Sequence, residues 1–432
     1  MSPFQVQVHQ NQYLPVGGDV VDAIVTVDSF GLAVNTPTAA HAAEVIIVDI
    51  SGSMDSPRAK LLAAKDATAA AIDCLRDGVE FAVVVGADNA EVIFPKRGLA
   101  VADDESRAEA KRTVRKLRAG GGTAIGRWLR AADALFERVP DAIHHAILLT
   151  DGQNVGQKPE ELAVDVARCV DRFQCDCRGV GADWDVDELR GIASSLLGSV
   201  DIIPDPADMV ADFTTMMQQS MGKAISGAAL RVWTPKGAHV EFVKQVQPSV
   251  EDLSARRTDV SERIGEYPTG AWGDECRDYH LRIRVTPQDA GAEMLAGRVQ
   301  LVVDGETTTE AKILVVWTPD EALSTKINAA VAQATDQAEL ADAIQRGIKA
   351  WELGDVDTAT THLGRAVQLA HEAGDVVRLE QLERIVVTDD AATGIVRVRP
   401  DASRLDRMTV DTQSTKTVLR VPDASRGDAR PT

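Results

Sequence analysis

The feature that most constrains the fold is an alternation of short apolar segments with helical patterns between residues 44 and 203. The apolar segments VIIVDI, FAVVVGA, VIFP, AILLTDG, CDCRGVG and VDIIP are too short for helices, and most end in Asp, Gly or Pro, which is typical of buried strands. Helices are expected after Pro57 and around 103–117, 124–138, 159–173, 186–195 and 206–221. Strands that alternate with helices predict a doubly wound, Rossmann-like parallel sheet covered on both faces.

The segments on either side of this α/β unit show the period-two alternation of antiparallel strands. Residues 4–30 alternate around a Pro-Val-Gly-Gly turn, and further Val-rich and Ile-rich segments follow between about 224 and 318. The N-terminal strands have no partner beside them in sequence. We therefore expect residues 1–38 and 224–318 to form one β-sandwich, with the α/β unit, 42–222, inserted in it.

The pattern becomes helical beyond Pro319, and residues 319–388 predict a small helical bundle. The two helices around Gly354-Asp355 look like one tetratricopeptide-type hairpin, although a single unit is not a repeat array. From residue 389 the chain is rich in Thr, Ser, Asp, Arg and Gly without periodicity, which favours a flexible, disordered tail.

Charge and composition narrow the classes of partner. The formal net charge is −20, from 66 acidic and 46 basic side chains, which disfavours nucleic acid and anionic lipid and favours basic protein surfaces or cations.

The sequence shows no secretory signal and no apolar stretch that could span a bilayer. Its five cysteines are thinly spread and odd in number. We expect a cytoplasmic protein with reduced thiols and no membrane partner.

Oxygen-bearing residues cluster at three predicted strand or loop ends. Asp49, Ser51 and Ser53 lie in DISGSM after the first apolar strand, Thr123 follows three glycines, and Asp151 ends AILLTDG. Ligands of open parallel sheets bind at this edge, and Gly52 allows a turn tight enough for both serines to reach one point. Three hydroxyls and two carboxylates are hard donors without His or Cys, which suits Mg²⁺ or Mn²⁺ and argues against zinc. Helix caps would also favour Asp and Ser here, but caps do not explain three convergent loops.

This set resembles the metal-ion-dependent adhesion site of von Willebrand factor A (VWA) domains. The family pattern is D-x-S-x-S, then a Thr, then an Asp, and all five positions are filled within residues 42–222. The resemblance implies that Ser51, Ser53 and Thr123 ligate the ion directly, and that Asp49 and Asp151 act directly or through water. It leaves one coordination position for a carboxylate of a partner protein. The flanking segments look like those of intracellular bacterial VWA proteins.

The function implied by this resemblance is metal-dependent protein binding, regulatory or scaffolding, rather than catalysis. No basic or nucleophilic side chain beyond the ligating hydroxyls lies in these motifs, so we expect no enzyme activity. Two alternatives stay open: a substrate adaptor for a separate chelatase-like or MoxR-like AAA+ ATPase, and a metal-dependent phosphatase or hydrolase. The Cys175 and Cys177 pair is expected to be buried, and His144 and His145 are expected at the start of a core strand.

A threonine-rich segment near the C-terminus, 408–421, suggests a second kind of partner. A flexible tail would present Thr412, Thr415 and Thr417 to a Ser/Thr kinase as an accessible peptide. The segment resembles the phosphothreonine peptides read by forkhead-associated (FHA) domains, and Thr415, with Val418 three residues later, is the best candidate. The alternative is a solvated tail with no reader.

Overall fold

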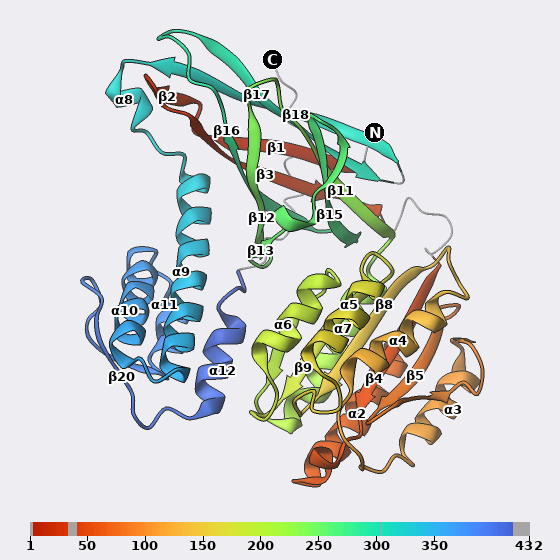
Figure 1. Cartoon of the computed structure of the whole chain (residues 1–432). Coiled ribbons are helices and arrows are strands. Elements are labelled where there is room, and N and C mark those ends of the chain that lie inside the picture. Colours follow the sequence, from red (N-terminus) through yellow and green to blue (C-terminus); the bar gives the residue numbers. More distant parts are fainter. Residues whose placement is uncertain (1–2, 33–40, 304, 418–432) are drawn as a thin grey trace. The chain divides into compact units, whose positions relative to one another are not determined.

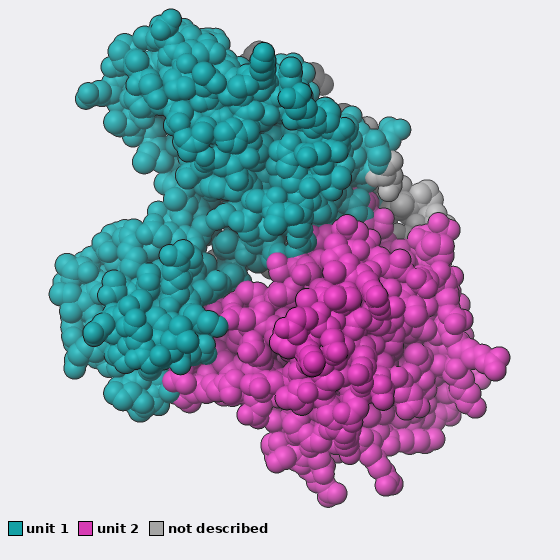
Figure 2. Space-filling model, viewed as in Figure 1, with its two compact units in different colours: residues 1–35, 227–402, 413–432 teal, residues 36–226, 403–412 magenta. Residues whose placement is uncertain are grey.

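The chain has two compact units (Figures 1 and 2). The structure is a computed structural model that describes residues 3–32, 41–303 and 305–417. One unit combines residues 1–35, 227–402 and 413–432, and the other combines 36–226 and 403–412. The N-terminus of the chain therefore belongs to the same unit as a segment that begins about two hundred residues later, as expected for an inserted domain.

The inserted unit contains the predicted parallel sheet. Its strand order is β10–β9–β8–β4–β5–β6, with β7 also pairing with β5. All neighbours from β10 to β5 are parallel, whereas β6 and β7 are antiparallel to β5 at one edge. The strands are β4 Ala42–Asp49, β5 Glu80–Gly86, β6 Ala90–Phe94, β7 Ala100–Val101, β8 Ile143–Thr150, β9 Gln174–Val180 and β10 Val200–Ile203. The doubly wound α/β fold is thus confirmed.

Helices cover both faces of this sheet because its strands are apolar on both faces. Val45 and Ile47 share a core with residues of α4, α5 and α6, while Ile46 and Val48 alternate with them and face the opposite side, and all four are fully buried. Each such side chain contributes about 1.5–3 kcal/mol on burial. The helical elements are η1 Gly52–Asp55, α2 Ala59–Cys74, α3 Asp104–Val114, α4 Ile125–Phe136, α5 Pro159–Cys169, α6 Val186–Ser195, η2 Pro206–Asp208 and α7 Met209–Met221.

Two tryptophans pack against glycines at the carboxyl ends of strands. A Cβ atom on Gly86, the last residue of β5, would lie 2.2 Å from the Trp128 ring, and one on Gly179 in β9 would lie 2.0 Å from the Trp184 ring. Each indole Nε1 donates to a nearby backbone carbonyl, Trp128 to Ala87 at 2.8 Å and Trp184 to Gly181 at 2.9 Å. These contacts fix α4 and the loop after β9 close to the sheet edge where the predicted site lies.

The N-terminal strands complete a sandwich of two mainly antiparallel sheets, as predicted. One sheet has the order β1–β3–β16–β12–β13 and the other β14–β15–β11–β17–β18–β2. In the first, β3 runs antiparallel to β16, from Val20 opposite Arg284 to Asp28 opposite Cys276. The strands are β1 Phe4–Gln10, β2 Tyr13–Pro15, β3 Val20–Ser29, β11 Ile225–Trp233, β12 His239–Gln247, β13 Glu251–Asp252, β14 Thr258–Ser261, β15 Ile264–Trp272, β16 Cys276–Arg284, β17 Glu293–Val303 and β18 Glu306–Thr318.

Aromatic contacts join the two sheets of the sandwich. The ring of Phe4 in β1 meets the ring of Trp272 in β15 edge to face, with 5.6 Å between their centroids. The guanidinium of Arg277 in β16 lies over the same Trp272 ring at 4.2 Å. Such edge-to-face and cation–π contacts fix the packing of one sheet on the other beyond the area they bury.

Helices follow the sandwich, as the sequence predicts. They are α8 Glu321–Ser324, α9 Ala329–Glu352, α10 Val356–Glu372 and α11 Val376–Leu382. Gly354 adopts a φ of +81° after α9, and the Asp355 side chain accepts a hydrogen bond from the Thr358 backbone N–H at the start of α10. None of the described helices is both long and apolar enough to cross a bilayer.

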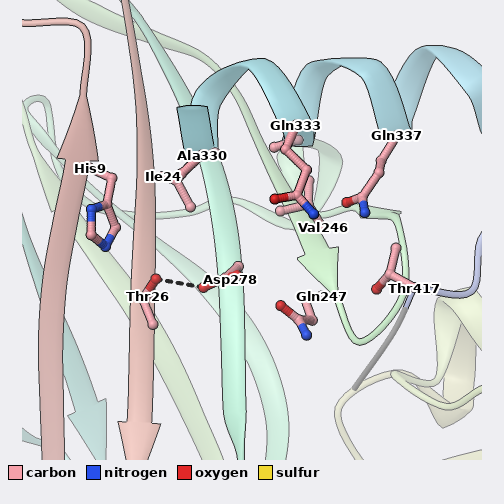
Figure 3. Close-up of a pocket in the computed structure, with 11 residues that line it drawn as sticks. His9, Ile24, Thr26, Val246, Gln247, Asp278, Ala330, Gln333, Gln337 and Thr417 are labelled. Carbon is pink, nitrogen blue, oxygen red and sulfur yellow. Dashed lines mark hydrogen bonds between the residues drawn. The ribbon is translucent and has the colours of Figure 1, made fainter. Parts of the chain in front are cut away.

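A cavity of about 320 Å³ lies between the first sandwich sheet and the N-terminal part of α9 (Figure 3). In the wall of the cavity, the Thr26 hydroxyl in β3 donates to Asp278 of the neighbouring strand β16 at 2.6 Å (Figure 3). The cavity mixes apolar walls with several amides and one carboxylate, and this lining selects no single class of ligand. Its lining residues are His9, Ile24, Thr26, Val246, Gln247, Asp278, Ala330, Gln333, Ala334, Gln337 and Thr417.

The C-terminal region is more ordered than the sequence suggested. A hairpin of β19 Val386–Asp390 and β20 Ile395–Val398 is followed by a helix, α12 Arg404–Gln413. The predicted start of a disordered tail at residue 389 is therefore wrong, and residues 418–432 lie outside the described residues. The physical reason is burial, since Met408 of α12 belongs to the core of the inserted unit.

The threonines proposed as kinase targets do not lie in an extended, free peptide. Thr412 is only 1% exposed, and its hydroxyl donates to the Met408 carbonyl at 2.7 Å within α12. The Thr415 carbonyl accepts from the Val250 N–H at 2.8 Å, and the Thr417 N–H donates to the Pro248 carbonyl at 3.0 Å. The structure thus contradicts the accessibility expected of Thr412, and it pairs the backbone around Thr415 and Thr417 with the β12–β13 turn.

Candidate metal centre

The five predicted ligand residues lie at one edge of the parallel sheet. Asp49 is the last residue of β4, and Ser51 and Ser53 lie in the turn that follows. Asp151 follows β8, which pairs directly with β4, so both turns leave the sheet side by side. Thr123 lies just before α4. The arrangement follows from parallel pairing, which places successive carboxyl ends at the same edge.

Hydrogen bonds link the side chains of the two turns directly. The Ser51 and Ser53 hydroxyl oxygens are 2.9 Å apart, and the Ser53 hydroxyl donates to Asp151 Oδ1 at 2.6 Å. A Cβ atom on Gly152 would lie 3.4 Å from both Ser53 Oγ and Thr123 Oγ1, so Thr123 lies beside the same point. The oxygens of Ser51, Ser53, Thr123 and Asp151 therefore converge as predicted.

Asp49 is fully buried beneath this cluster. Its Oδ1 accepts from the Ser51 N–H and its Oδ2 accepts from the Thr150 hydroxyl, both at 2.6 Å. Burial, with a smaller contribution from the nearby Asp151, raises the pKa of Asp49 to about 6 against the opposing effect of the hydrogen bonds from Ser51 and Thr150. Sequence reasoning missed Thr150. Its position immediately before the predicted ligand Asp151 was the signal that could have found it.

The three glycines before Thr123 bring their loop against the Asp49 turn. The Gly52 N–H donates to the Gly121 carbonyl at 3.0 Å, and the Gly120 N–H donates to the Ile50 carbonyl at 2.7 Å. Gly121 has a φ of +90°, which side-chain-bearing residues rarely adopt. The glycines therefore allow the backbone before Thr123 to lie directly against the backbone of the Asp49 turn.

A second loop contact places Thr123, and sequence reasoning missed it as well. Asn154 Oδ1 accepts from the N–H of Ile125, the first residue of α4, at 2.9 Å. The Gly156 N–H donates to the Thr123 carbonyl at 2.7 Å. The loop after Asp151 therefore holds both the start of α4 and Thr123. Burial also raises the pKa of Glu188, which accepts from the Asn154 N–H, to about 7.

A buried lysine contacts one of the predicted ligands. Lys60, in the first turn of α2, donates from Nζ to Asp151 Oδ2 at 2.8 Å. Only 9% of the Lys60 side chain is exposed and none of the Asp151 side chain. The sequence analysis did not single out Lys60, since its partner is 91 positions away.

A separate buried network lies near the opposite end of the strands. His145 lies in β8 between Glu44 in β4, at 2.7 Å, and Asp176 in β9, at 3.0 Å. Burial alone would lower the pKa of His145, but the two carboxylates outweigh it and raise the pKa to about 10. His144 and His145 thus lie at the start of a core strand, as predicted, and Cys175 and Cys177 are fully buried.

The donor set fits a hard divalent cation. It offers three hydroxyls and two carboxylates already in contact or close proximity, and no imidazole or thiolate lies among them. Among the residues that the structure describes, no metal site could be formed by three or more His, Cys, Asp or Glu side chains alone. The candidate site is of another kind, because three of its five donors are hydroxyls. Hydroxyl and carboxylate oxygens suit Mg²⁺ or Mn²⁺ better than zinc.

Known proteins resemble this chain in sequence and in fold. The profile of the von Willebrand factor type A domain matches residues 43–202. A solved von Willebrand factor type A protein from Catenulispora acidiphila is 48% identical, with a TM-score of 0.91 over 96% of this chain and 97% of that chain. The ArnB paralog VWA2 from Sulfolobus acidocaldarius, 12% identical with a TM-score of 0.60 over 96% and 98% of the two chains, shares the fold alone.

A more distant sequence relative is an uncharacterised protein of Synechocystis sp. It is 26% identical over 276 residues, which cover 62% of this chain and 63% of that protein.

Proposed function

Because this chain belongs to the von Willebrand factor type A family, we propose that its candidate metal centre holds Mg²⁺ or Mn²⁺ and binds an acidic side chain of a partner protein. The observation that carries this proposal is the contact between the Ser51, Ser53 and Asp151 side chains across the β4 and β8 turns. These turns place hydroxyl and carboxylate oxygens around one point without any soft ligand.

Each residue has a distinct part in this proposal. Ser51, Ser53 and Thr123 would ligate the ion, and Asp49 and Asp151 would act directly or through water. The Thr150 hydroxyl and the Ser51 N–H hold the Asp49 carboxylate in place from opposite oxygens. When bound, the ion supplies a Lewis-acidic position for one anionic oxygen of the partner.

We propose binding rather than catalysis at this site. In the described part of the chain, the basic side chain that hydrogen-bonds to the site is Lys60. Its ammonium pairs with the carboxylates of Asp151 and Asp183. A group committed to two carboxylates is poorly placed to act as a general base. A role as substrate adaptor for a separate AAA+ ATPase would use the same binding site, and co-purification of an ATPase would distinguish it.

An affinity capture with the full chain as bait tests this function. Asp49→Ala removes a buried carboxylate of the site, while Asp55→Ala removes an exposed carboxylate of the same turn and serves as the matched control. We expect partner proteins to be retained in Mg²⁺, and to be lost in EDTA and with Asp49→Ala but not with Asp55→Ala. The same captured proteins in EDTA as in Mg²⁺ would contradict the proposal, and a metal-dependent hydrolysis lost in Asp49→Ala would favour the enzyme alternative.

A further inference from the structure

Lys60 is a buried lysine whose ammonium lies between two loops of the sheet edge. Its Nζ is 2.8 Å from Asp151 Oδ2, after β8, and 3.5 Å from Asp183 Oδ2, after β9. The Lys60 stem runs past Gly181, where an added Cβ would lie 4.0 Å from Lys60 Cε. The first turn of α2 therefore places a cation in contact with the carboxylate of Asp151, one of the predicted ligands.

The burial of this pair distinguishes it from a surface ion pair. Lysine is almost never buried without a partner, because removing an ammonium from water is costly unless an opposite charge compensates it. The Asp151 side chain has no solvent exposure, so its negative charge likewise needs partners that compensate it. Asp183 is 71% exposed and forms the outer end of this arrangement.

The two oxygens of Asp151 have different partners. Oδ2 accepts from the Lys60 ammonium, and Oδ1 accepts from the Ser53 hydroxyl inside the cluster. Because a carboxyl group is planar, holding Oδ2 also fixes where Oδ1 points. Lys60, which is not itself a predicted ligand, thus orients the Asp151 oxygen that faces the cluster.

We propose that Lys60, besides orienting Asp151, tunes the charge of the metal centre toward an anionic partner, and that this effect of its charge on Mg²⁺ affinity outweighs the effect of orientation. The inference rests on the proposed function. Because Asp183 is 71% exposed and screened by water, the ammonium mainly offsets the charge of the buried Asp151, so a bound divalent cation keeps an uncompensated positive charge. A partner carboxylate can neutralise that charge, whereas a neutral partner oxygen cannot. Lys60 therefore weakens the hold on the ion alone and makes tight binding depend on the acidic partner.

Titration of the full-length chain with Mg²⁺ alone, followed by calorimetry, tests this role. Lys60→Met keeps the apolar stem and removes the charge, whereas Lys60→Arg keeps the charge. Lys65→Met on the same helix is the matched control, since the Lys65 ammonium donates to the Arg115 backbone carbonyl at 3.3 Å in an exposed hydrogen bond. We expect Lys60→Met to bind Mg²⁺ about tenfold more tightly than wild type. Lys60→Arg and Lys65→Met should stay within about threefold of wild type.

A second variant guards against a Lys60→Met protein that does not fold. Asp183→Asn removes the exposed partner of Lys60 and leaves the candidate ligands unchanged. Because more of the ammonium charge is then uncompensated, Mg²⁺ binding should weaken about twofold to fivefold. Wild-type Mg²⁺ binding that neither Lys60→Met nor Asp183→Asn changes would overturn this proposal alone. A wild-type chain that binds no Mg²⁺ would overturn the proposed function together with it.

Discussion

Asp411 of α12 accepts a hydrogen bond from the Arg190 guanidinium of α6 at 2.7 Å, across 221 positions of sequence. The same guanidinium donates to the Asp411 backbone carbonyl at 3.1 Å. Only 22% of the Arg190 side chain and 13% of the Asp411 side chain are exposed. The pair joins the last described helix to the inserted α/β unit, which therefore includes residues from the far end of the chain.

Loss of this pair should loosen α12. Asp411→Ala removes the charged acceptor, and we expect a loss of about 1–2 kcal/mol in the free energy of unfolding together with faster amide exchange across 404–413. Asp187→Ala is the control, because Asp187 also contacts Arg190, at 3.4 Å, but its side chain is 61% exposed. Hydrogen exchange by mass spectrometry measures the effect. Unchanged exchange in α12 of Asp411→Ala would show that the helix docks through its apolar side chains alone.

The contact between Gly86 and Trp128 predicts opposite outcomes for two glycine substitutions. Gly86→Ala places a methyl group inside the indole ring's volume, so we expect a loss of about 1–3 kcal/mol in unfolding free energy. Gly191→Ala, within α6, meets nothing within 4 Å and should stabilise the chain by up to about 1 kcal/mol through helix propensity. Urea denaturation of both variants decides the matter, and equal effects would mean that the indole can move aside.

The buried His145 gives the inserted unit a pH-dependent stability on the alkaline side. Its pKa of about 10 in the folded chain lies above the ordinary 6.5, so its stabilising effect is complete below about pH 6.5 and is lost as pH rises toward 10. We expect the wild-type free energy of unfolding to fall more steeply between these values than that of His145→Gln. His144→Gln is the neighbouring control, since His144 contacts backbone carbonyls rather than carboxylates. Parallel slopes for wild type and His145→Gln would contradict the assignment.

Asp151 and Lys60 should be coupled energetically before any metal binds. Asp151→Ala leaves the Lys60 ammonium largely buried, with the more distant Asp183 as its remaining carboxylate partner in the described part of the chain. The loss of a partner from a buried pair costs about 3–5 kcal/mol. The same substitution in a Lys60→Met background should cost markedly less, because no charge is stranded. A double-mutant cycle of unfolding free energies in EDTA measures the coupling. Additive effects would mean that the two side chains do not interact in solution.

The fold and the convergence of the candidate ligand residues could be predicted because both depend on local patterns. The strand ends that carry Asp49 and Asp151 are visible as short apolar runs followed by turn residues, and parallel pairing then brings them together. The N-terminal strands were placed in the sandwich because their period-two alternation had no partner nearby. The residues that were missed, Lys60 and Asn154, act on partners whose proximity only the folded chain shows.

The C-terminal helix could not be predicted for a different physical reason. Its threonines suggested a polar, disordered segment, but Thr409 and Thr412 satisfy their hydroxyls within the helix by donating to the carbonyls of Leu405 and Met408, each at 2.7 Å. Met408 then packs into the core. The role of Thr415 as a phosphorylation site read by an FHA-domain protein stays a prediction, which phosphopeptide analysis of the native protein can test.

The most direct test of the central claim is a calorimetric Mg²⁺ titration of wild type and Ser53→Ala. Ser53 contacts both Ser51 and Asp151, and its side chain is partly exposed, so its loss should remove a ligand without disturbing the core. Ser56→Ala, at an exposed position of the same turn, is the control. We predict one Mg²⁺ per wild-type chain, affinity reduced at least about tenfold in Ser53→Ala, and no change in Ser56→Ala. The absence of Mg²⁺ binding by the wild type, or equal affinity in Ser53→Ala, would contradict the account.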